Sequence, residues 1–237
     1  MTAPTATRPR NNPNAGPAKS RRTTPAATPA PRRTGWKLGA AIAAVIAVAA
    51  VIAIAASGDD SDSSSVAPGI QQTRPVMITG TPLAPLSGSG GTDPAIGAIA
   101  PAISGQSFDG TPVSTRTGRP TLLVFLAHWC PHCRAEVPVL VDWQRSGAAP
   151  AGLDVVGIAT GTDSTRPNYP PSTWLAGAGF PWPVIADSAT YDAGNAMGLT
   201  AFPYFVLVNA DGAVVARASG ELTPAALDTL VAQVVPA

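Results

Sequence analysis

The distribution of apolar and polar residues divides the chain into segments of different character. The longest apolar run covers residues 38–56, nineteen residues without a charge, and at a rise of about 1.5 Å per residue a helix of this length spans about 28 Å. This length matches the roughly 30 Å hydrocarbon core of a bilayer, so the run predicts a single transmembrane helix. Residues 1–37 are rich in Pro, Thr, Ala and Arg and are predicted to be disordered. Residues 57–95 are rich in Ser, Gly, Pro and Asp and predict a flexible linker.

From residue 96 the pattern predicts a folded domain that extends to residue 237. Continuous apolar runs at 120–127 and 153–159 are typical of central strands covered on both faces. Apolar residues at helical spacing follow the first run, over residues 131–144. The other expected elements are a hairpin turn at Asp109-Gly110, helices near 172–178 and 189–199, a strand at 182–186, a hairpin of strands 204–209 and 213–219, and a helix from Thr223. This order of elements predicts an α/β layer fold.

The distribution of charge predicts that a membrane separates the two ends of the chain. Residues 1–37 contain eight Lys and Arg and no acid, whereas residues 57–237 contain seven Arg and fourteen Asp and Glu. By the positive-inside rule the N-terminus is cytoplasmic, and the folded domain lies outside the cytoplasm. A cleaved signal peptide, with Ala53-Ile54-Ala55 as its cleavage site, is the alternative, although the basic region and the apolar run are long for one. The acidic part has no basic patch for binding nucleic acid.

Both cysteines of the chain, Cys130 and Cys133, lie where a predicted strand meets a predicted helix. A Cys-x-x-Cys pair in this context indicates redox chemistry. The unpaired N–H groups and the dipole at the start of the helix favour a thiolate at the first cysteine, and the thiolate is the attacking species. Cys133 lies one turn further on and can close a disulfide with it. His132, between the two sulfurs, can add positive charge and hydrogen bonding near the Cys130 sulfur.

Two other roles for the cysteines compete with redox chemistry. A purely structural disulfide across so short a loop would be strained and would constrain few residues of the unfolded chain. A copper- or zinc-handling site is the second alternative, because every His and Cys of the chain falls within six residues. These residues are His128, Cys130, His132 and Cys133, and both residue types bind these metals. Adjacent positions in one turn are expected to point apart, so no metal or other cofactor is predicted.

Two segments of the sequence resemble the TlpA/ResA-like thioredoxins, which are membrane-anchored extracytoplasmic disulfide oxidoreductases. Residues 124–140, VFLAHWCPHCRAEVPVL, are similar to the active-site segment of that family. Residues 198–208 are similar to its strand with a cis-proline that faces the active site. The resemblance covers residues 97–237 and implies a thioredoxin-like fold, in which helices flank a central mixed sheet. Residues 163–190 would supply the family's αβ insertion.

The resemblance also implies roles for individual residues around the cysteines. Pro203 would be the cis-proline, with Phe202 before it, and the backbone there would pair with an extended substrate. Trp129 would shape the rim of the site. Glu136, three residues after the second cysteine, would assist proton transfer. Its alternative role is that of an acid that stabilises the start of the helix.

The sequence departs from its relatives in ways that leave the direction of electron flow open. Val124 stands where cytoplasmic thioredoxins carry a buried Asp, and no Lys follows the apolar run. The dipeptide Pro131-His132 resembles that of DsbA, a strong oxidant, whereas the surrounding sequence resembles a family of reductants, so the reducing direction is favoured. The resemblance implies exported Cys-containing proteins, such as apocytochrome c, as substrates. It also implies a membrane redox partner that recharges the cysteine pair.

Overall fold

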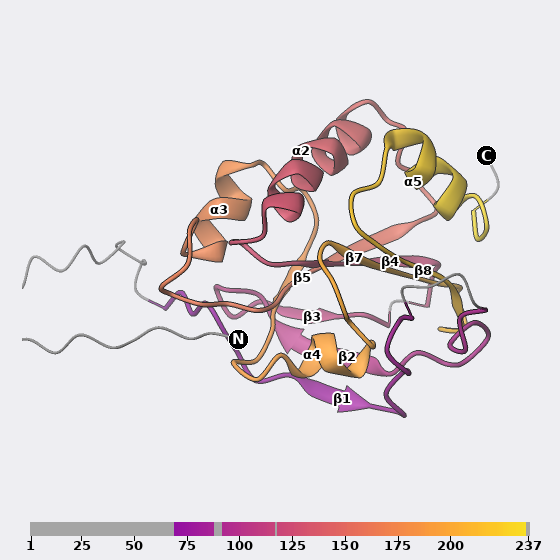
Figure 1. The fold of residues 1–237 in the computed structure, drawn as a ribbon, viewed down its shortest axis with the longest axis horizontal. Helices are drawn as coiled ribbons and strands as arrows, with labels where there is room; N and C mark the ends of the chain where they lie inside the picture. Colours follow the sequence, from indigo (N-terminus) through magenta and orange to yellow (C-terminus); the bar gives the residue numbers. More distant parts are fainter. Residues whose placement is uncertain (1–68, 88–91, 117, 236–237) are drawn as a thin grey trace, which may run out of the picture. The chain divides into compact units, whose positions relative to one another are not determined.

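A five-stranded mixed sheet forms the centre of the described part of the chain (Figure 1). The computed structural model describes residues 69–87, 92–116 and 118–235. The strand order is β6-β5-β4-β7-β8, in which β5 and β6 are parallel to β4, β7 is antiparallel to β4, and β8 is antiparallel to β7. The strands are β4 (Thr121–Leu126), β5 (Asp154–Ala159), β6 (Val184–Ala186), β7 (Tyr204–Val208) and β8 (Val214–Ser219).

Three helices cover one face of this sheet, and a short helix lies on the other face with a second, small sheet (Figure 1). The helices on the first face are α2 (Pro131–Arg145), α3 (Pro171–Gly177) and α5 (Pro224–Val231), and the helix on the second face is α4 (Asp192–Ala196). Each of the three helices on the first face begins with a proline, whose missing N–H would have had no partner there. Thr223 caps α5 by accepting a hydrogen bond of 3.2 Å from the Ala226 N–H. The expected mixed sheet flanked by helices is confirmed.

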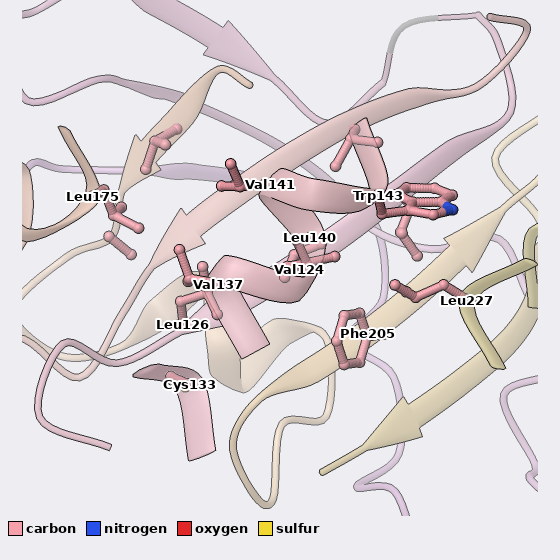
Figure 2. Packing of buried hydrophobic residues seen from close by; sticks show 14 of the residues in the cluster. Val124, Leu126, Cys133, Val137, Leu140, Val141, Trp143, Leu175, Phe205 and Leu227 are labelled. Atoms are coloured by element: carbon pink, nitrogen blue, oxygen red, sulfur yellow. The ribbon is translucent and has the colours of Figure 1, made fainter. Parts of the chain in front are cut away.

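Strand β4 is buried along its whole length because it lies in the middle of the sheet. Side chains alternate between the two faces of a strand, so β4 contributes to two separate cores. Val124 and Leu126 pack beneath α2 with Leu140 (Figure 2). Leu123 and Phe125 belong to the core on the opposite face. The strand that leads into the Cys-x-x-Cys segment is therefore held from both sides.

The folded domain begins earlier than the boundary predicted at residue 96. A small antiparallel sheet, in the order β1-β2-β3, takes its first strand from before that position and its other two strands from after it. Its strands are β1 (Met77–Thr79), β2 (Ala102–Gln106) and β3 (Pro112–Ser114). Leu83 is buried, and Ile70 packs against the core beneath the helices. The prediction of a linker over 57–95 is thus wrong for residues 70–87. The apolar residues of this segment stand singly among Pro and polar residues, so they give no periodic signal. They are buried by partners that lie far away in the sequence.

The predicted disordered segment 1–37 and the predicted span 38–56 lie outside the described residues. Across residues 69–87, 92–116 and 118–235, no helix has both the length and the apolar character needed to cross a bilayer.

Candidate active site

Cys130 and Cys133 lie at the start of α2, directly after the central strand β4. Cys130 is the N-cap residue of the helix, and Pro131 occupies its first turn. The Cys130 N–H donates a hydrogen bond of 3.0 Å to the Ala127 carbonyl, which turns the chain from strand into helix. Both cysteines are free thiols in this structure. The unpaired N–H groups of the first helical turn favour negative charge at this point, as expected from the sequence.

The two thiols differ in their surroundings. Cys133 is completely buried, whereas Cys130 retains 6% of its surface. Burial is the main cause that raises the pKa of the Cys133 thiol, and it outweighs the hydrogen bond of 3.4 Å that the Ala127 N–H donates to the Cys133 sulfur. Cys130 is thus the less buried of the two cysteines, and Cys133 lies one turn further into the helix.

The structure brings the three predicted substrate-contact residues together beside Cys130. The peptide bond between Phe202 and Pro203 is cis, as the resemblance implies, and it leads into β7, the neighbour of β4. The Cys130 thiol lies 3.9 Å from the Phe202 carbonyl oxygen and can donate to it. The rings of Trp129 and Phe202 meet edge to face, with 5.8 Å between centroids. An extended substrate chain could align with this backbone next to the reactive sulfur.

Glu136 is a buried carboxyl one helical turn beyond Cys133. Its side chain is fully buried, and its Oε2 accepts a hydrogen bond of 2.8 Å from the Leu222 N–H. Its Oε1 has no hydrogen-bond partner among the residues that the structure describes. Burial raises the pKa of Glu136 to about 7, against the opposing effect of the bond from Leu222. The negative charge of Glu136 adds a small contribution to the raised pKa of Cys133.

His132 has a partner that the sequence did not predict. Its Nδ1 lies 2.6 Å from Oε1 of Glu221, and both side chains are substantially exposed, at 67% and 48%. Glu221 precedes Leu222 in the turn between β8 and α5. The segment between β8 and α5 therefore contacts two residues near the start of α2. The Glu221 carboxylate contacts His132, and the Leu222 N–H donates to Glu136.

His128 does not join the other three residues of the alternative metal site. Its side chain is buried, and both ring nitrogens have partners, the Pro167 carbonyl at 2.7 Å and the Asp163 N–H at 3.2 Å. Across the described parts of the chain, no three His, Cys, Asp or Glu side chains are grouped so that they could hold a metal ion. The structure thus does not assemble the copper or zinc site that the clustering in the sequence suggested.

Several residues around the site had no signal in the sequence. The Gly161 carbonyl accepts a hydrogen bond of 2.7 Å from the indole nitrogen of Trp129, and the guanidinium of Arg166 lies 4.5 Å from the centre of the Trp129 ring system. Asn168 donates a hydrogen bond of 3.0 Å to the His128 carbonyl. These residues belong to the loop after β5, and only the presence of an insertion there could be predicted.

Comparisons with known proteins find relatives over part of the chain. The chain is 30% identical over 128 residues to methylamine utilization protein MauD of Methylobacillus flagellatus. The aligned region covers 52% of this chain and 57% of that protein. It is 29% identical over 101 residues to tryparedoxin of Trypanosoma brucei brucei. That alignment covers 41% of this chain and 67% of tryparedoxin. The chain thus spans little more than half the length of its MauD relative.

Among solved structures, the chain is similar to a thiol:disulfide interchange protein of the thioredoxin family from Chlorobium tepidum. It is 31% identical, covers 56% of this chain and 92% of its own, and superposes with a TM-score of 0.47. The family model described as Redoxin matches residues 95–233, a range that includes both cysteines, Glu136 and Pro203. The match extends over more than half of the chain and coincides with the thioredoxin-like α/β fold around the mixed sheet. The chain therefore belongs to the redoxin family.

Proposed function

We propose that the protein is a thiol–disulfide oxidoreductase that exchanges disulfides with Cys-containing proteins through Cys130 and Cys133. The observation that carries this proposal is the arrangement of the two sulfurs. Cys130, the less buried of the two, is the N-cap residue of α2, and its thiol lies 3.9 Å from the carbonyl that precedes cis-Pro203. The buried Cys133 lies behind it in the first turn.

In the reducing direction, the Cys130 thiolate attacks one sulfur of a substrate disulfide. A bond forms between that sulfur and Cys130, the substrate S–S bond breaks, and the second substrate sulfur leaves as a thiolate that takes a proton. Cys133 then loses its proton and attacks the Cys130 sulfur, which closes the Cys130–Cys133 disulfide and releases the first substrate thiolate. Two electrons pass from the cysteine pair to the substrate, and a dithiol donor has to return them. The oxidising direction is the reverse sequence.

Glu136 serves the second step as the proton acceptor for Cys133. The buried thiol strongly prefers its protonated form, because burial raises its pKa. A carboxyl with a pKa of about 7 is partly ionised at neutral pH and can both take and release a proton. Glu136 is the one acid among the buried residues of α2, all of which the structure describes, and Val124 stands where an acid would occupy the adjoining strand. Proton transfer at this position therefore falls to Glu136.

We place this activity outside the cytoplasm, on a single-pass membrane protein whose N-terminus is cytoplasmic. The support is the apolar run 38–56, the eight basic residues before it and the excess of acid after it. The substrates would then be exported Cys-containing proteins, with apocytochrome c as one candidate. A membrane redox partner would recharge the pair in the reducing direction.

Trapping of the mixed disulfide tests the proposed chemistry. Wild-type protein should reduce insulin in the presence of dithiothreitol, and Cys133→Ser should accumulate a covalent adduct with a disulfide-containing protein. Cys130→Ser is the matched control and should give neither adduct nor reduction. Failure of the wild-type protein both to reduce insulin and to oxidise a reduced model protein would rule out the activity. An adduct that forms on Cys130→Ser would reverse the assigned order of the two cysteines.

The predicted location needs a separate experiment on the full chain. Alkaline phosphatase, which folds only where disulfides form, is fused to the C-terminus and compared with a matched fusion to green fluorescent protein. We expect an active phosphatase. If the phosphatase fusion is inactive and the matched fusion to green fluorescent protein is fluorescent, the domain lies in the cytoplasm.

A further inference from the structure

The loop that follows β5, residues 161–169, lies against the residues immediately before Cys130. Its first residue, Gly161, accepts the hydrogen bond from the indole nitrogen of Trp129 at 2.7 Å. Arg166, from the middle of the loop, stacks its guanidinium over the Trp129 ring at 4.5 Å. Trp129 also meets the Phe202 ring edge to face. The loop thus determines how one of the two aromatic side chains beside Cys130 is held.

His128 anchors this loop through its side chain. The ring is 1% exposed. Its Nδ1 lies 2.7 Å from the Pro167 carbonyl, and its Nε2 accepts from the Asp163 N–H at 3.2 Å. A carbonyl oxygen only accepts and a backbone N–H only donates, so these partners require a neutral ring with its proton on Nδ1. The pKa of His128 is lowered, mainly by burial, which agrees with a neutral ring.

The backbone of His128 is bound to the same loop. Asn168 donates from its side-chain amide to the His128 carbonyl at 3.0 Å. Asn168 itself has a φ of 61°, a left-handed conformation that Asn tolerates better than most residues. The Tyr169 ring meets the His128 ring edge to face, with centroids 5.9 Å apart. The side chain and the main chain of His128 therefore contact the loop at several points between Asp163 and Tyr169.

We propose that His128 is a positioning residue that fixes loop 161–169 against Trp129 and thereby sets the affinity of the site for protein substrates. The inference rests on the proposed function and assigns the selection of substrate to this loop. A protein chain that aligns beside Pro203 passes the surface formed by Trp129, Phe202 and Arg166, whereas a small disulfide needs only the Cys130 sulfur. Loss of the anchor should raise KM for a protein substrate and leave the chemistry at sulfur unchanged.

Steady-state kinetics with two substrates separates these effects. Insulin is the protein disulfide, and 5,5′-dithiobis(2-nitrobenzoic acid) is the small one. His128→Ala removes both ring contacts, and the nearly isosteric Asn168→Asp replaces the donor to the His128 carbonyl with a carboxylate oxygen, which cannot donate. One lost hydrogen bond corresponds to roughly a two- to tenfold change in an equilibrium constant. We expect KM for insulin to rise about fivefold in His128→Ala and about twofold in Asn168→Asp, with kcat and the small-disulfide rate within about twofold of wild type.

Ser164→Ala is the matched control, because Ser164 is an exposed residue of the same loop, and it should leave both substrates unaffected. Hydrogen exchange provides a structural readout, since the Asp163 amide should exchange faster once the His128 acceptor is removed. If His128→Ala does not fold, Asn168→Asp, at an exposed position, decides the question. An unchanged KM for insulin in the folded variants, or an equal loss with the small disulfide, would overturn the inference. Wild-type protein that exchanges with neither substrate would instead refute the proposed function.

Discussion

Burial controls the protonation of the two residues behind the reactive sulfur. Cys133 and Glu136 are both 0% exposed, and burial is the main cause that raises the pKa of each, that of Glu136 to about 7. A buried thiol with a raised pKa is inert until a base removes its proton. A carboxyl that titrates near neutral pH can act as that base. Under the proposed function, the pair would transfer protons at a site that has Val124 in the central strand.

Replacement of Glu136 should change the pH dependence of the resolving step. Because the carboxyl pKa is raised from 4.5 to about 7, its ionised fraction, and with it the rate at which Cys133 resolves a mixed disulfide, should rise between about pH 6 and 8. In Glu136→Gln the inflection near pH 7 should be lost, and the rate at pH 7 should fall at least about tenfold. Single-turnover release of a labelled peptide thiol measures the rate. Asp142→Asn, at an exposed carboxylate of the same helix, is the control. An identical pH profile in Glu136→Gln would contradict the proposed role.

The contact between His132 and Glu221 should affect the redox equilibrium more than the stability. Contacts between exposed charged side chains contribute about 0–1 kcal/mol, so Glu221→Gln should leave the melting temperature almost unchanged. Without the Glu221 carboxylate, His132 is free to place its donor near the Cys130 sulfur, which favours the thiolate that belongs to the reduced pair. The reduction potential should therefore become less negative, by about 10 mV. Equilibration with glutathione measures it. The shift should disappear in a His132→Ala background, and its persistence there would show that Glu221 does not act through His132.

At the scale of elements, the site is assembled where strand ends, a helix start and two loops meet. Strand β4 leads into α2, and the Phe202–Pro203 peptide leads into the neighbouring strand β7. The Gly220 N–H donates to the Pro203 carbonyl at 2.9 Å, which ties the end of β8 to the cis-proline. Helices α2 and α5 are joined by a hydrogen bond of 2.9 Å from Trp143 to Asp228. The redox pair is thus held by elements from the whole second half of the chain.

The buried face of α2 should stabilise the domain without taking part in the chemistry. Leu140 is 0% exposed and packs in the core beneath the helices (Figure 2). Leu140→Ala should lower the free energy of unfolding by about 2–5 kcal/mol, through lost apolar burial and a residual cavity. Urea denaturation measures the loss, and Gln144→Ala, at an exposed position of the same helix, should change little. A Leu140→Ala protein as stable as wild type would show that this interface is not a main source of stability.

At the scale of the whole described domain, residues before the predicted boundary complete the fold. Strand β1 pairs with β2, and Leu83 packs in the core on the face opposite α2. Asp93 forms an ion pair with Arg217 of β8, whose side chain is 0% exposed. The Arg217 guanidinium also donates to the Tyr204 hydroxyl at 3.1 Å. The polar segment before residue 96 therefore supplies both apolar contacts and the counter-charge of a buried cation.

Truncation distinguishes the predicted boundary from the observed one. A chain that begins at residue 69 should match the stability of the full domain, because it keeps β1 and Asp93. A chain that begins at residue 96 leaves Arg217 buried without its carboxylate, a loss typically worth about 3–5 kcal/mol. Thermal unfolding of the two chains gives the comparison. Asp93→Asn in the longer chain isolates the contribution of the ion pair. Equal stability of the two truncated chains would contradict the structural role of residues 69–95.

The parts of the fold and of the site that could be predicted from the sequence depend on local signals. Continuous apolar residues identify β4 and β5, and a proline after an N-cap residue identifies the starts of α2 and α5. The redox pair was recognisable because Cys130 and Cys133 lie within one turn, between a buried strand and a helix. Strand β1 was missed because three residues between polar neighbours carry too little periodicity for a prediction.

Sequence alone determined the chemistry of this protein, because a thiol pair at a helix start is specified by neighbouring residues. Only the tertiary structure decided which distant residues surround the cysteine pair. It paired His132 with Glu221, 89 residues away, and it bound His128 to Asp163, 35 residues away. Contacts over such separations leave no periodic trace in the sequence, since they depend on which strand ends meet at one edge of the sheet.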